Sequence, residues 1–237
     1  MTDPMTSKKL LCLDTATRVQ TAALVESTAG RIRVVAEHTV YRKRPGPTLL
    51  DDLDRLLTDA GWTLGELDGF VCGQGPGSFT GLRITLATLK GLALALDRPI
   101  HAARTTEMLR ANRPGPRTFA LIDARRGQVY IDGPGIETPL VVDPERVPAL
   151  VARPDPVLVG DGALAFAETL AGLMPAAEIP DDPTAHMPRA AHLAALIDPE
   201  KPDPLGTTEP IYVRPSDAEL NYPDGFPDAL VRFGLDR

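Results

Sequence analysis

The sequence predicts an α/β protein made of two related halves, of which the second is reduced. Strand-like and helix-like segments follow one another up to residue 102. A stretch rich in proline and glycine, 110–117, then separates the two halves. Each half opens with a buried strand that ends in an aspartate, Asp14 or Asp123, and continues into a second strand after a short turn. This correspondence indicates a faint internal duplication.

The first half has the pattern of three strands followed by two helix–strand units. Thr48 stands where an N-cap residue is preferred, and Asp51 places negative charge in the first helical turn. Gly30 marks a turn between two strands, and Gly61 is a natural helix stop. The expected elements are strands over 9–14, 21–26, 31–40, 67–73 and 99–102, and helices over 48–60 and 81–96.

The second half is richer in proline and poorer in helix. Its expected elements are strands over 118–123, 128–132, 137–142 and 157–160, helices over 162–173 and 188–197, and an extended piece over 211–214. The expected division is a first α/β domain over 1–109, a second, reduced α/β domain over 110–215, and a tail over 216–237.

The composition is that of a globular protein, with 43% hydrophobic and 24% charged residues. No run approaches the roughly 20 apolar residues of a membrane span, and the polar N-terminus predicts no secretory signal. Cys12 and Cys72 lie in apolar runs and are interpreted as buried, reduced thiols, which favours a cytoplasmic location. The net charge of −7 disfavours a protein that grips a nucleic acid backbone by itself, so the basic runs 42–44 and 125–126 are interpreted as solvated loops.

The glycine-rich turn after residue 73 is a candidate anion cradle, because it leads into a helix N-terminus. The weak candidates for cofactor contacts are Asp14, Gly75, Gly77 and Ser78. The turn lacks the Gly-Lys-Ser/Thr of a P-loop, and Asp14 is not followed by the glycine that lets a backbone wrap a phosphate. The structural alternative places Gly75 and Gly77 at positive φ, with Ser78 or Thr80 capping the helix.

The helix over 81–96 has apolar residues on two opposite sides. The bulky stripe consists of Leu82, Leu86, Leu89, Ala93 and Leu96 and suits the parent sheet. The stripe of smaller residues consists of Ile84, Ala87, Gly91 and Ala95, and Arg83 and Lys90 share a polar seam between the stripes. Two apolar sides predict burial on two sides. The second neighbour is either the chain's own helix over 48–60 or a helix of a partner.

No catalytic constellation and no metal site are predicted. None of the four histidines, His38, His101, His186 and His192, lies four residues from another, so the helical two-histidine metal motif is missing. There is no Gly-x-Ser-x-Gly, and both cysteines lie in strands, which does not suit a nucleophile.

Five stretches match one family in order and cover most of the chain. They are LCLDTAT at 11–17, GQGPGSFTGLRITLATLKGLALAL at 73–96, ALIDARRGQVY at 120–130, VLVGDGA at 157–163 and PIYVR at 210–214. Together they resemble the TsaB family of tRNA threonylcarbamoyladenosine biosynthesis subunits, formerly grouped with M22 glycoprotease homologues. The sequence departs from many relatives at 45–48, where Pro-Gly-Pro-Thr replaces a His-Ser pair, and the segment 132–145 is short.

The resemblance implies the actin, sugar-kinase and Hsp70 fold, which is ribonuclease H-like, and a non-catalytic partner subunit. Such a subunit pairs with and activates the catalytic paralogue TsaD, which threonylcarbamoylates adenosine 37 of tRNAs that read codons beginning with A. It further implies an ATPase partner, TsaE, only indirect contact with tRNA, and no cofactor on this chain alone. ATP or ADP at the interface of the complex, and a homodimer of the isolated chain, stay open.

The resemblance also implies that the two helices of the first half contact the partner. The expected interface residues are Leu49, Leu53, Leu56, Leu57, Ile84, Ala87, Thr88, Gly91 and Ala95. The rival hypothesis is a small ATP-dependent phosphotransferase or ATPase of the same fold, which would use Asp14, Asp123 and the glycine loop. A metalloprotease is a third hypothesis, for which the sequence offers no metal motif.

Overall fold

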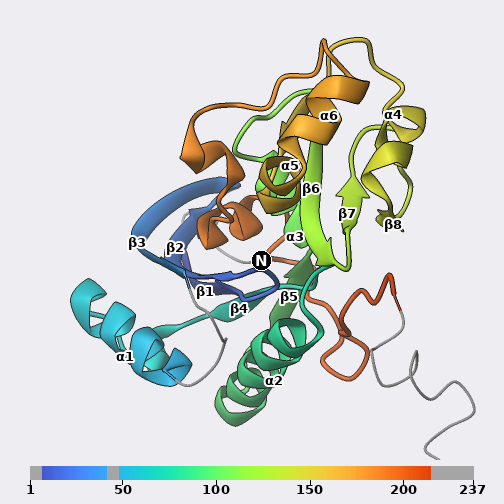
Figure 1. The fold of residues 1–237 in the computed structure, drawn as a ribbon. Helices are drawn as coiled ribbons and strands as arrows, with labels where there is room; N and C mark the ends of the chain where they lie inside the picture. The colour runs from blue at the N-terminus through green and yellow to red at the C-terminus, as the bar shows by residue number, and fades with distance from the viewer. Residues whose placement is uncertain (1–6, 42–47, 215–237) are drawn as a thin grey trace, which may run out of the picture.

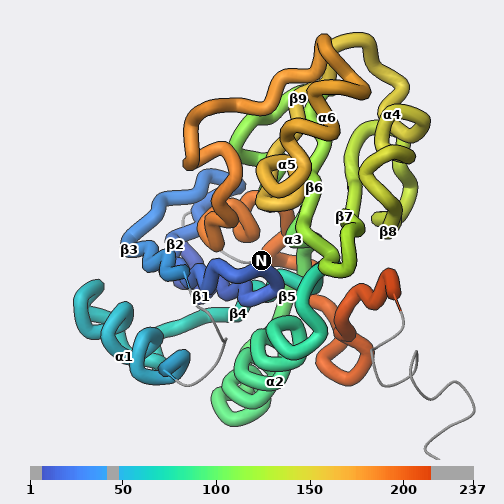
Figure 2. Tube along the Cα trace, in the orientation of Figure 1, coloured from blue at the N-terminus to red at the C-terminus, as the bar shows by residue number. Residues whose placement is uncertain are grey.

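The computed structural model describes residues 7–41 and 48–214, and these residues form two mixed sheets, one in each half of the chain (Figure 1). The first sheet has the strand order β3-β2-β1-β4-β5, and the second has the order β8-β7-β6-β9. The trace in Figure 2 shows the first sheet with α1 and α2 in the lower part of the molecule, and the second sheet with α4 and α6 in the upper part. The basic run 42–44 and the tail 216–237 lie outside the described residues.

The helices and strands have the following bounds, with η for 3-10 helices. The first half contains β1 (Lys8–Asp14), β2 (Val19–Thr28), β3 (Arg31–Tyr41), α1 (Leu49–Ala60), η1 (Leu64–Glu66), β4 (Gly69–Gly73), α2 (Phe79–Leu96), β5 (Ile100–Ala103) and α3 (Thr105–Arg110). The second half contains β6 (Thr118–Arg125), β7 (Gln128–Asp132), β8 (Leu140–Val142), η2 (Pro144–Arg146), α4 (Val147–Leu150), β9 (Val157–Val159), α5 (Asp161–Ala165), α6 (Ala167–Leu173), η3 (Pro183–His186) and η4 (Ala190–Ala195).

The two halves share one pattern of strand pairing. β1 pairs antiparallel with β2 and parallel with β4, and β6 pairs antiparallel with β7 and parallel with β9. Asp14 is in register with Thr21 on β2, and Asp123 is in register with Val129 on β7. The structure therefore confirms the duplication that the sequence indicates.

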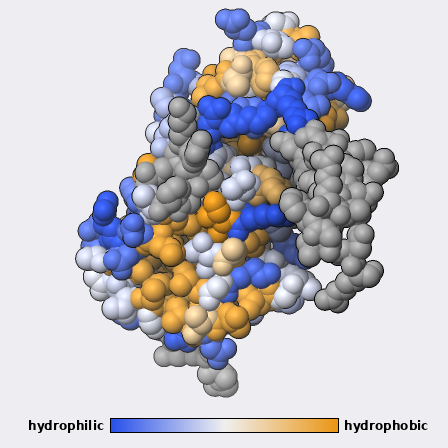
Figure 3. Space-filling view, turned by 60° about the horizontal axis from the view of Figure 1, so that its bottom comes forward, coloured by the Kyte–Doolittle hydropathy of each residue, from blue (hydrophilic) through white to orange (hydrophobic). Residues whose placement is uncertain are grey.

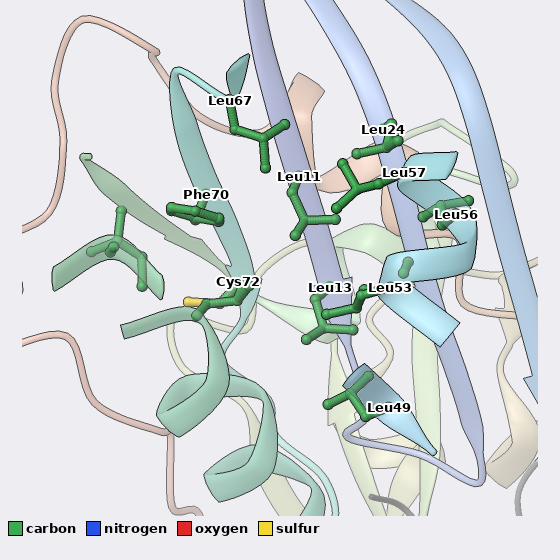
Figure 4. Close-up of a cluster of buried hydrophobic side chains, with 14 of the residues drawn as sticks. Leu11, Leu13, Leu24, Leu49, Leu53, Leu56, Leu57, Leu67, Phe70 and Cys72 are labelled. Carbon is green, nitrogen blue, oxygen red and sulfur yellow. The ribbon is translucent and has the colours of Figure 1, made fainter. Parts of the chain in front are cut away.

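Helix α1 packs on the first sheet through a stripe of leucines. Figure 4 shows these side chains pointing toward β1 and β2, where they join the core cluster of the first sheet. The buried residues are Leu49, Leu53, Leu56 and Leu57. Burying one leucine contributes roughly 1.5–3 kcal/mol, so this stripe fixes α1 on the sheet. The helix ends at Gly61, whose φ of 68° is the left-handed conformation that glycine adopts freely.

The N-terminus of α1 is held by a polar contact with the sheet. Thr48 is the N-cap residue, as expected, but its hydroxyl donates to Asp52 Oδ2 at 3.1 Å instead of accepting from a backbone N–H. Gln20 Nε2 on β2 donates to the same carboxylate oxygen at 2.7 Å. Asp52 is buried, so this pair of hydrogen bonds compensates its desolvation.

The opposite face of the first sheet is covered by η4 from the far end of the chain. Ala190, Leu193 and Ala194 are buried in one cluster with Cys12 and Val71 of the sheet. The segment belongs by sequence to the expected second domain, yet its core contacts are with the first sheet. The division into domains stays a prediction.

Several boundaries differ from the expected ones. The strand expected over 67–73 begins at Gly69, and the one expected over 137–142 begins at Leu140. The helix expected over 162–173 is divided at Phe166, whose φ and ψ of −117° and 24° interrupt the helical backbone. The helix expected over 188–197 is the 3-10 helix η4, whose first N–H groups bond to side chains of the first sheet.

One described helix, α2, is long and apolar enough to cross a membrane, with mean hydropathy 1.3 over 18 residues. Its 18 residues include Arg83 and Lys90, so it is a weak candidate by length and composition rather than an uninterrupted apolar run. The core helix of a soluble protein passes the same test of length and composition, and α2 contributes Leu86, Leu89 and Ala93 to the core of the first sheet.

Candidate functional site

Asp14 lies at the end of β1 and is completely buried beside the glycine loop. Its Oδ2 accepts a hydrogen bond of 2.6 Å from the Thr105 hydroxyl, and its Oδ1 accepts one of 2.9 Å from Ala16 N–H. Burial raises the pKa of the Asp14 carboxyl to about 6, although both hydrogen bonds act in the opposite direction. The carboxyl is thus engaged by its own chain on both oxygens.

The turn after β1 packs directly onto the start of α2. Thr15 Oγ1 donates to the Gly81 carbonyl at 2.7 Å, and Thr85 Oγ1 accepts from Thr15 N–H at 3.1 Å. A Cβ at Gly81 would lie 1.9 Å from the Thr15 carbonyl oxygen, and one at Gly73 would lie 1.8 Å from Asp14 Oδ2. These glycines are required because backbone and carboxylate come too close for any side chain.

Two N–H groups at the N-terminus of α2, those of Ser78 and Gly81, bond within the chain. The Ser78 N–H donates to the Ala16 carbonyl at 2.6 Å, and the Gly81 N–H donates to Ser78 Oγ at 3.2 Å. Ser78 therefore caps the helix, as expected. Because the turn after β1 lies over the loop, the candidate anion cradle is closed by the protein's own backbone.

The two loop glycines serve different purposes. Gly75 has φ of 97°, which confirms the expected positive φ, and its N–H donates to Thr105 Oγ1 at 3.1 Å. The same expectation for Gly77 is wrong, because Gly77 is not among the described residues with positive φ. A Cβ at Gly77 would instead lie 2.3 Å from the Ala16 carbonyl oxygen. Gly77 is required because the Ala16 backbone, which is remote in the sequence, leaves no room for a side chain.

Asp123 occupies the equivalent place in the second half. Its Oδ2 is 2.8 Å from Arg125 Nη1, and its own N–H donates to Asp161 Oδ1 at 3.0 Å. Burial raises the pKa of the Asp161 carboxyl. Arg125 and Arg126 are exposed in the turn, at φ of 63° and 54°. Within 7–41 and 48–214 no hydrogen bond joins Asp14 to Asp123, and each is bonded to residues of its own half of the chain.

The histidines have structural surroundings. His186 is buried, with Nδ1 3.2 Å from the Gly160 amide and Nε2 2.7 Å from the Pro180 carbonyl. His101 is buried on β5, and its Nδ1 has no hydrogen-bond partner among the described residues. Burial lowers the pKa of this histidine. Among the residues that the structure describes, no three His, Cys, Asp or Glu side chains are grouped so that they could hold a metal ion.

The outer side of α2 carries the stripe of small residues, and no residue of 7–41 or 48–214 covers it. Ala87, Gly91 and Ala95 are exposed, and Ile84 and Thr88 are half-buried. A Cβ built on Gly91 would have no neighbour within 4 Å. The expected alternative, in which the chain's own helix over 48–60 covers this stripe, is therefore wrong, because α1 turns its leucines to the sheet.

Two large exposed leucines are not among the expected interface residues, one on each of the helices α2 and α1. Leu94 on α2 is 73% exposed and Leu50 on α1 is 66% exposed. Figure 3 shows the end of the molecule that carries α1 and α2, with hydrophobic residues gathered over a broad area. Leu50 directly follows Leu49, and Leu94 directly follows Ala93. Because successive residues of a helix are about 100° apart, a search along the stripe that contains Leu49 or Ala93 does not find them.

The expected interface set divides in two. Ile84, Ala87, Thr88, Gly91 and Ala95 lie at least partly on the surface. The four leucines of α1, by contrast, are buried in the core of the first sheet and present no free face. The sequence shows an amphipathic helix in both cases, but only the tertiary fold decides which stripe faces the sheet.

The chain is similar in sequence to one protein-family model and to several known proteins. Residues 47–135 match the family model described as TsaD, tRNA N6-adenosine threonylcarbamoyltransferase. An uncharacterized protein of Mycobacterium tuberculosis is 33% identical over 216 residues, which cover 89% of this chain and 93% of that protein.

Two curated tRNA threonylcarbamoyladenosine biosynthesis proteins named TsaB also match. The protein from Bacillus subtilis is 36% identical over 126 residues, covering 51% of this chain and 52% of that protein. The protein from Escherichia coli is 32% identical over 152 residues, covering 59% of this chain and 64% of that protein. The chain thus aligns with between about half and two thirds of the length of these relatives.

A solved structure has the same fold. YeaZ from Pseudomonas aeruginosa superposes with a TM-score of 0.66 at 28% sequence identity, covering 86% of this chain and 99% of that one. This agreement, with the two mixed sheets of the chain, confirms the expected fold class.

Proposed function

The chain belongs to the TsaB family, and on this basis we propose that it is a non-catalytic partner subunit in tRNA threonylcarbamoyladenosine biosynthesis. The observation that carries the proposal is the exposed stripe on α2. Ala87, Gly91 and Ala95 leave the helix backbone open to close approach, and Leu94 adds a large apolar side chain beside them. A large exposed apolar area that a folded monomer does not cover is typical of an interaction site.

The proposed partner is the catalytic paralogue TsaD, whose family model this chain partly matches. A related fold would carry an equivalent pair of helices, so the two chains could pack helix on helix across this face. Small residues on α2 favour that arrangement, because the distance between packed helix axes, about 8–10 Å, depends on the side chains at the contact and is shorter where they are small. The contact would stabilise the partner in its active arrangement.

Threonylcarbamoyl transfer to adenosine 37 would belong to the partner, and the ATPase TsaE would join the pair. The chain would contact tRNA only indirectly, because its net charge of −7 does not suit a phosphate backbone. A cytoplasmic location follows from that role. Self-pairing over the same stripe when the partner is missing is a further expectation, which gel filtration of the chain alone measures.

The closed glycine loop supports the non-catalytic role over the rival phosphotransferase or ATPase. The Ser78 N–H and both Asp14 oxygens are bonded within the chain, and Ala16 lies over the loop. A nucleotide phosphate at this place would have to displace the turn after β1. The rival therefore needs a second conformation, whereas the partner-subunit role uses the observed one.

Reconstitution of the complex tests the proposal. The full chain should co-purify with the TsaD paralogue, and tRNA carrying A37 should be modified efficiently only when both are present with TsaE. Omitting this chain should abolish most of the modification. Full modification without it would contradict the proposed role.

Nucleotide titration of the isolated chain tests the rival. We expect no saturable binding of ATP with magnesium at micromolar concentrations and no turnover. Micromolar binding with ATP hydrolysis by the isolated chain would favour the phosphotransferase or ATPase instead.

A further inference from the structure

A segment from late in the chain, 203–212, runs along α2 and is called the clasp here. Figure 1 shows it beside α2, on the side away from α1. At its beginning the Asp203 N–H donates to the Ile100 carbonyl at 2.9 Å, and Asp203 Oδ2 accepts from Ala102 N–H at 2.7 Å. The clasp is therefore anchored on the free edge of β5, where it covers backbone groups that would otherwise be unpaired.

The clasp then contacts both cations of the polar seam of α2. Lys90 Nζ donates to the Thr208 carbonyl at 3.1 Å, and Arg83 Nε donates to the Tyr212 hydroxyl at 3.1 Å. The Tyr212 ring also packs on Phe79, with 5.1 Å between ring centroids, and the Arg83 guanidinium lies 3.8 Å from the centroid of Phe79. These contacts extend over the first three turns of α2.

The end of the clasp also reaches the glycine loop. The Ile211 N–H donates to the Gln74 carbonyl at 2.7 Å, immediately before the turn that leads into α2. The clasp thus joins three parts of the first half: the edge of β5, the glycine loop and the seam of α2. Each contact spans more than a hundred residues of sequence, as the separations of 118 and 129 for the two seam contacts illustrate.

The angular positions on α2 show what this arrangement leaves free. At 100° per residue, Arg83 and Lys90 lie between the leucines that face the sheet and the exposed stripe of Ala87 and Gly91. The sheet holds one side of the helix and the clasp holds the adjacent one. Within the part of the chain that the structure describes, this leaves the stripe and its margins open to a partner.

We propose that the clasp positions α2 for subunit pairing, with Asp203 and Tyr212 as positioning residues that act through the helix. The inference rests on the proposed function, because it assigns the partner to the α2 stripe. Its physical reason is that a helix held on two adjacent sides presents its third side in one orientation. Binding then loses less conformational freedom than with a helix that rocks on the sheet.

The test releases the clasp at its two ends separately. Tyr212→Ala removes the contact with Arg83 and Phe79, and Asp203→Ala removes the anchor on β5. Asp203 lies at the edge of β5, so a shared effect of the two variants cannot come from lost direct contact with a partner on α2. Tyr41→Ala is the matched control, because Tyr41 is also exposed and its hydroxyl accepts from Arg18 at 3.2 Å.

Two measurements are made on each variant. Amide hydrogen exchange in the isolated full chain should speed up in α2 for both variants, and affinity for the TsaD paralogue should fall by about tenfold. The double variant should be little weaker than either single one, because both release the same segment. Tyr212→Phe should restore most of the α2 protection through its ring.

Urea unfolding followed by the fluorescence of the single tryptophan, Trp62, shows whether each variant stays folded. The proposal that the clasp positions α2 would be contradicted if amide hydrogen exchange in α2 stayed unchanged in both single variants. It would also be contradicted if the Tyr41→Ala control lost as much affinity for the paralogue as they do. A wild-type chain that fails to bind the paralogue would contradict the proposed function instead. In that case the exchange of the α2 amides still decides whether the clasp holds the helix.

Discussion

The carbonyl oxygen of Ala16 accepts a 2.6 Å hydrogen bond from the backbone N–H of Ser78, so the turn after β1 closes the glycine loop. This contact occupies the Ser78 N–H, one of the donors at the N-terminus of α2. It also fixes the start of α2 against the end of β1. The loop therefore acts as a structural joint between β1 and α2, and α2 carries the exposed stripe.

Gly77→Ala tests this joint. The added Cβ would lie 2.3 Å from the Ala16 carbonyl oxygen, a backbone atom that cannot move without breaking the contact with Ser78. We expect the free energy of unfolding to fall by roughly 2–4 kcal/mol. Chemical denaturation followed by Trp62 fluorescence measures the loss.

Gly91→Ala is the matched control for that variant. Like Gly77, Gly91 is not among the described glycines with positive φ. Its added Cβ, however, meets no atom within 4 Å. Alanine is a better helix former than glycine, so we expect the free energy of unfolding to rise by up to about 1 kcal/mol. Equal effects of the two substitutions would show that crowding against Ala16 does not decide the role of Gly77.

Asp14→Asn should change how stability depends on pH. Burial raises the pKa of Asp14 from its usual value of 3.8 to about 6 in the folded chain, so the folded state binds this proton more tightly than the unfolded state. The stability that Asp14 contributes is therefore complete below pH 3.8 and is lost as pH rises through about 6.

Asparagine does not titrate, so the variant should gain stability relative to the wild type between pH 5 and pH 8. Only about one unit of the shift from 3.8 to about 6 titrates above pH 5, so the gain should be roughly 1.4 kcal/mol. Urea unfolding of both proteins at the two pH values measures it. A difference between the proteins that is the same at both pH values would show that the Asp14 carboxyl titrates normally.

The two cysteines should be unreactive in the native chain. Cys12 and Cys72 are fully buried, and burial raises the pKa of the Cys72 thiol to about 12 and that of Cys12 still further. A chromogenic disulfide reagent at pH 8 should therefore label neither thiol within minutes, and should label both after urea is added. Rapid labelling of the folded chain would show that the first sheet opens on that timescale.

Local signals account for most of the first half. Ser78 caps α2, Gly61 ends α1 and Gly75 takes positive φ because each depends on neighbours within a few residues. Gly77 was assigned the wrong reason, since its need for space comes from Ala16 on another element. The glycine-rich motif thus shows that a side chain is excluded at this position, but it does not show which part of the fold excludes it.

The features that the sequence does not predict depend mostly on contacts between segments that are far apart in the chain. The clasp depends on Tyr212 meeting Arg83 across 129 residues, and no periodicity over 203–212 indicates that pairing. The helix expected over 188–197 is a 3-10 helix, and its first N–H groups, those of Ala190 and Ala191, bond to Thr21 and Glu37 of the first sheet, contacts that are remote in the sequence. Two apolar stripes on α2 were visible in the sequence, but only the fold shows which of them stays exposed.

The most direct test of the account places a bulky side chain on the exposed stripe. Ala87→Trp should leave the free energy of unfolding close to that of the wild type, because Ala87 lies on the surface. In gel filtration with the TsaD paralogue, the folded variant should elute as an uncomplexed chain, while the Tyr41→Ala control, which changes an exposed residue outside the stripe, elutes in the complex. An intact complex formed by the folded Ala87→Trp variant would contradict the assignment of this face to the partner.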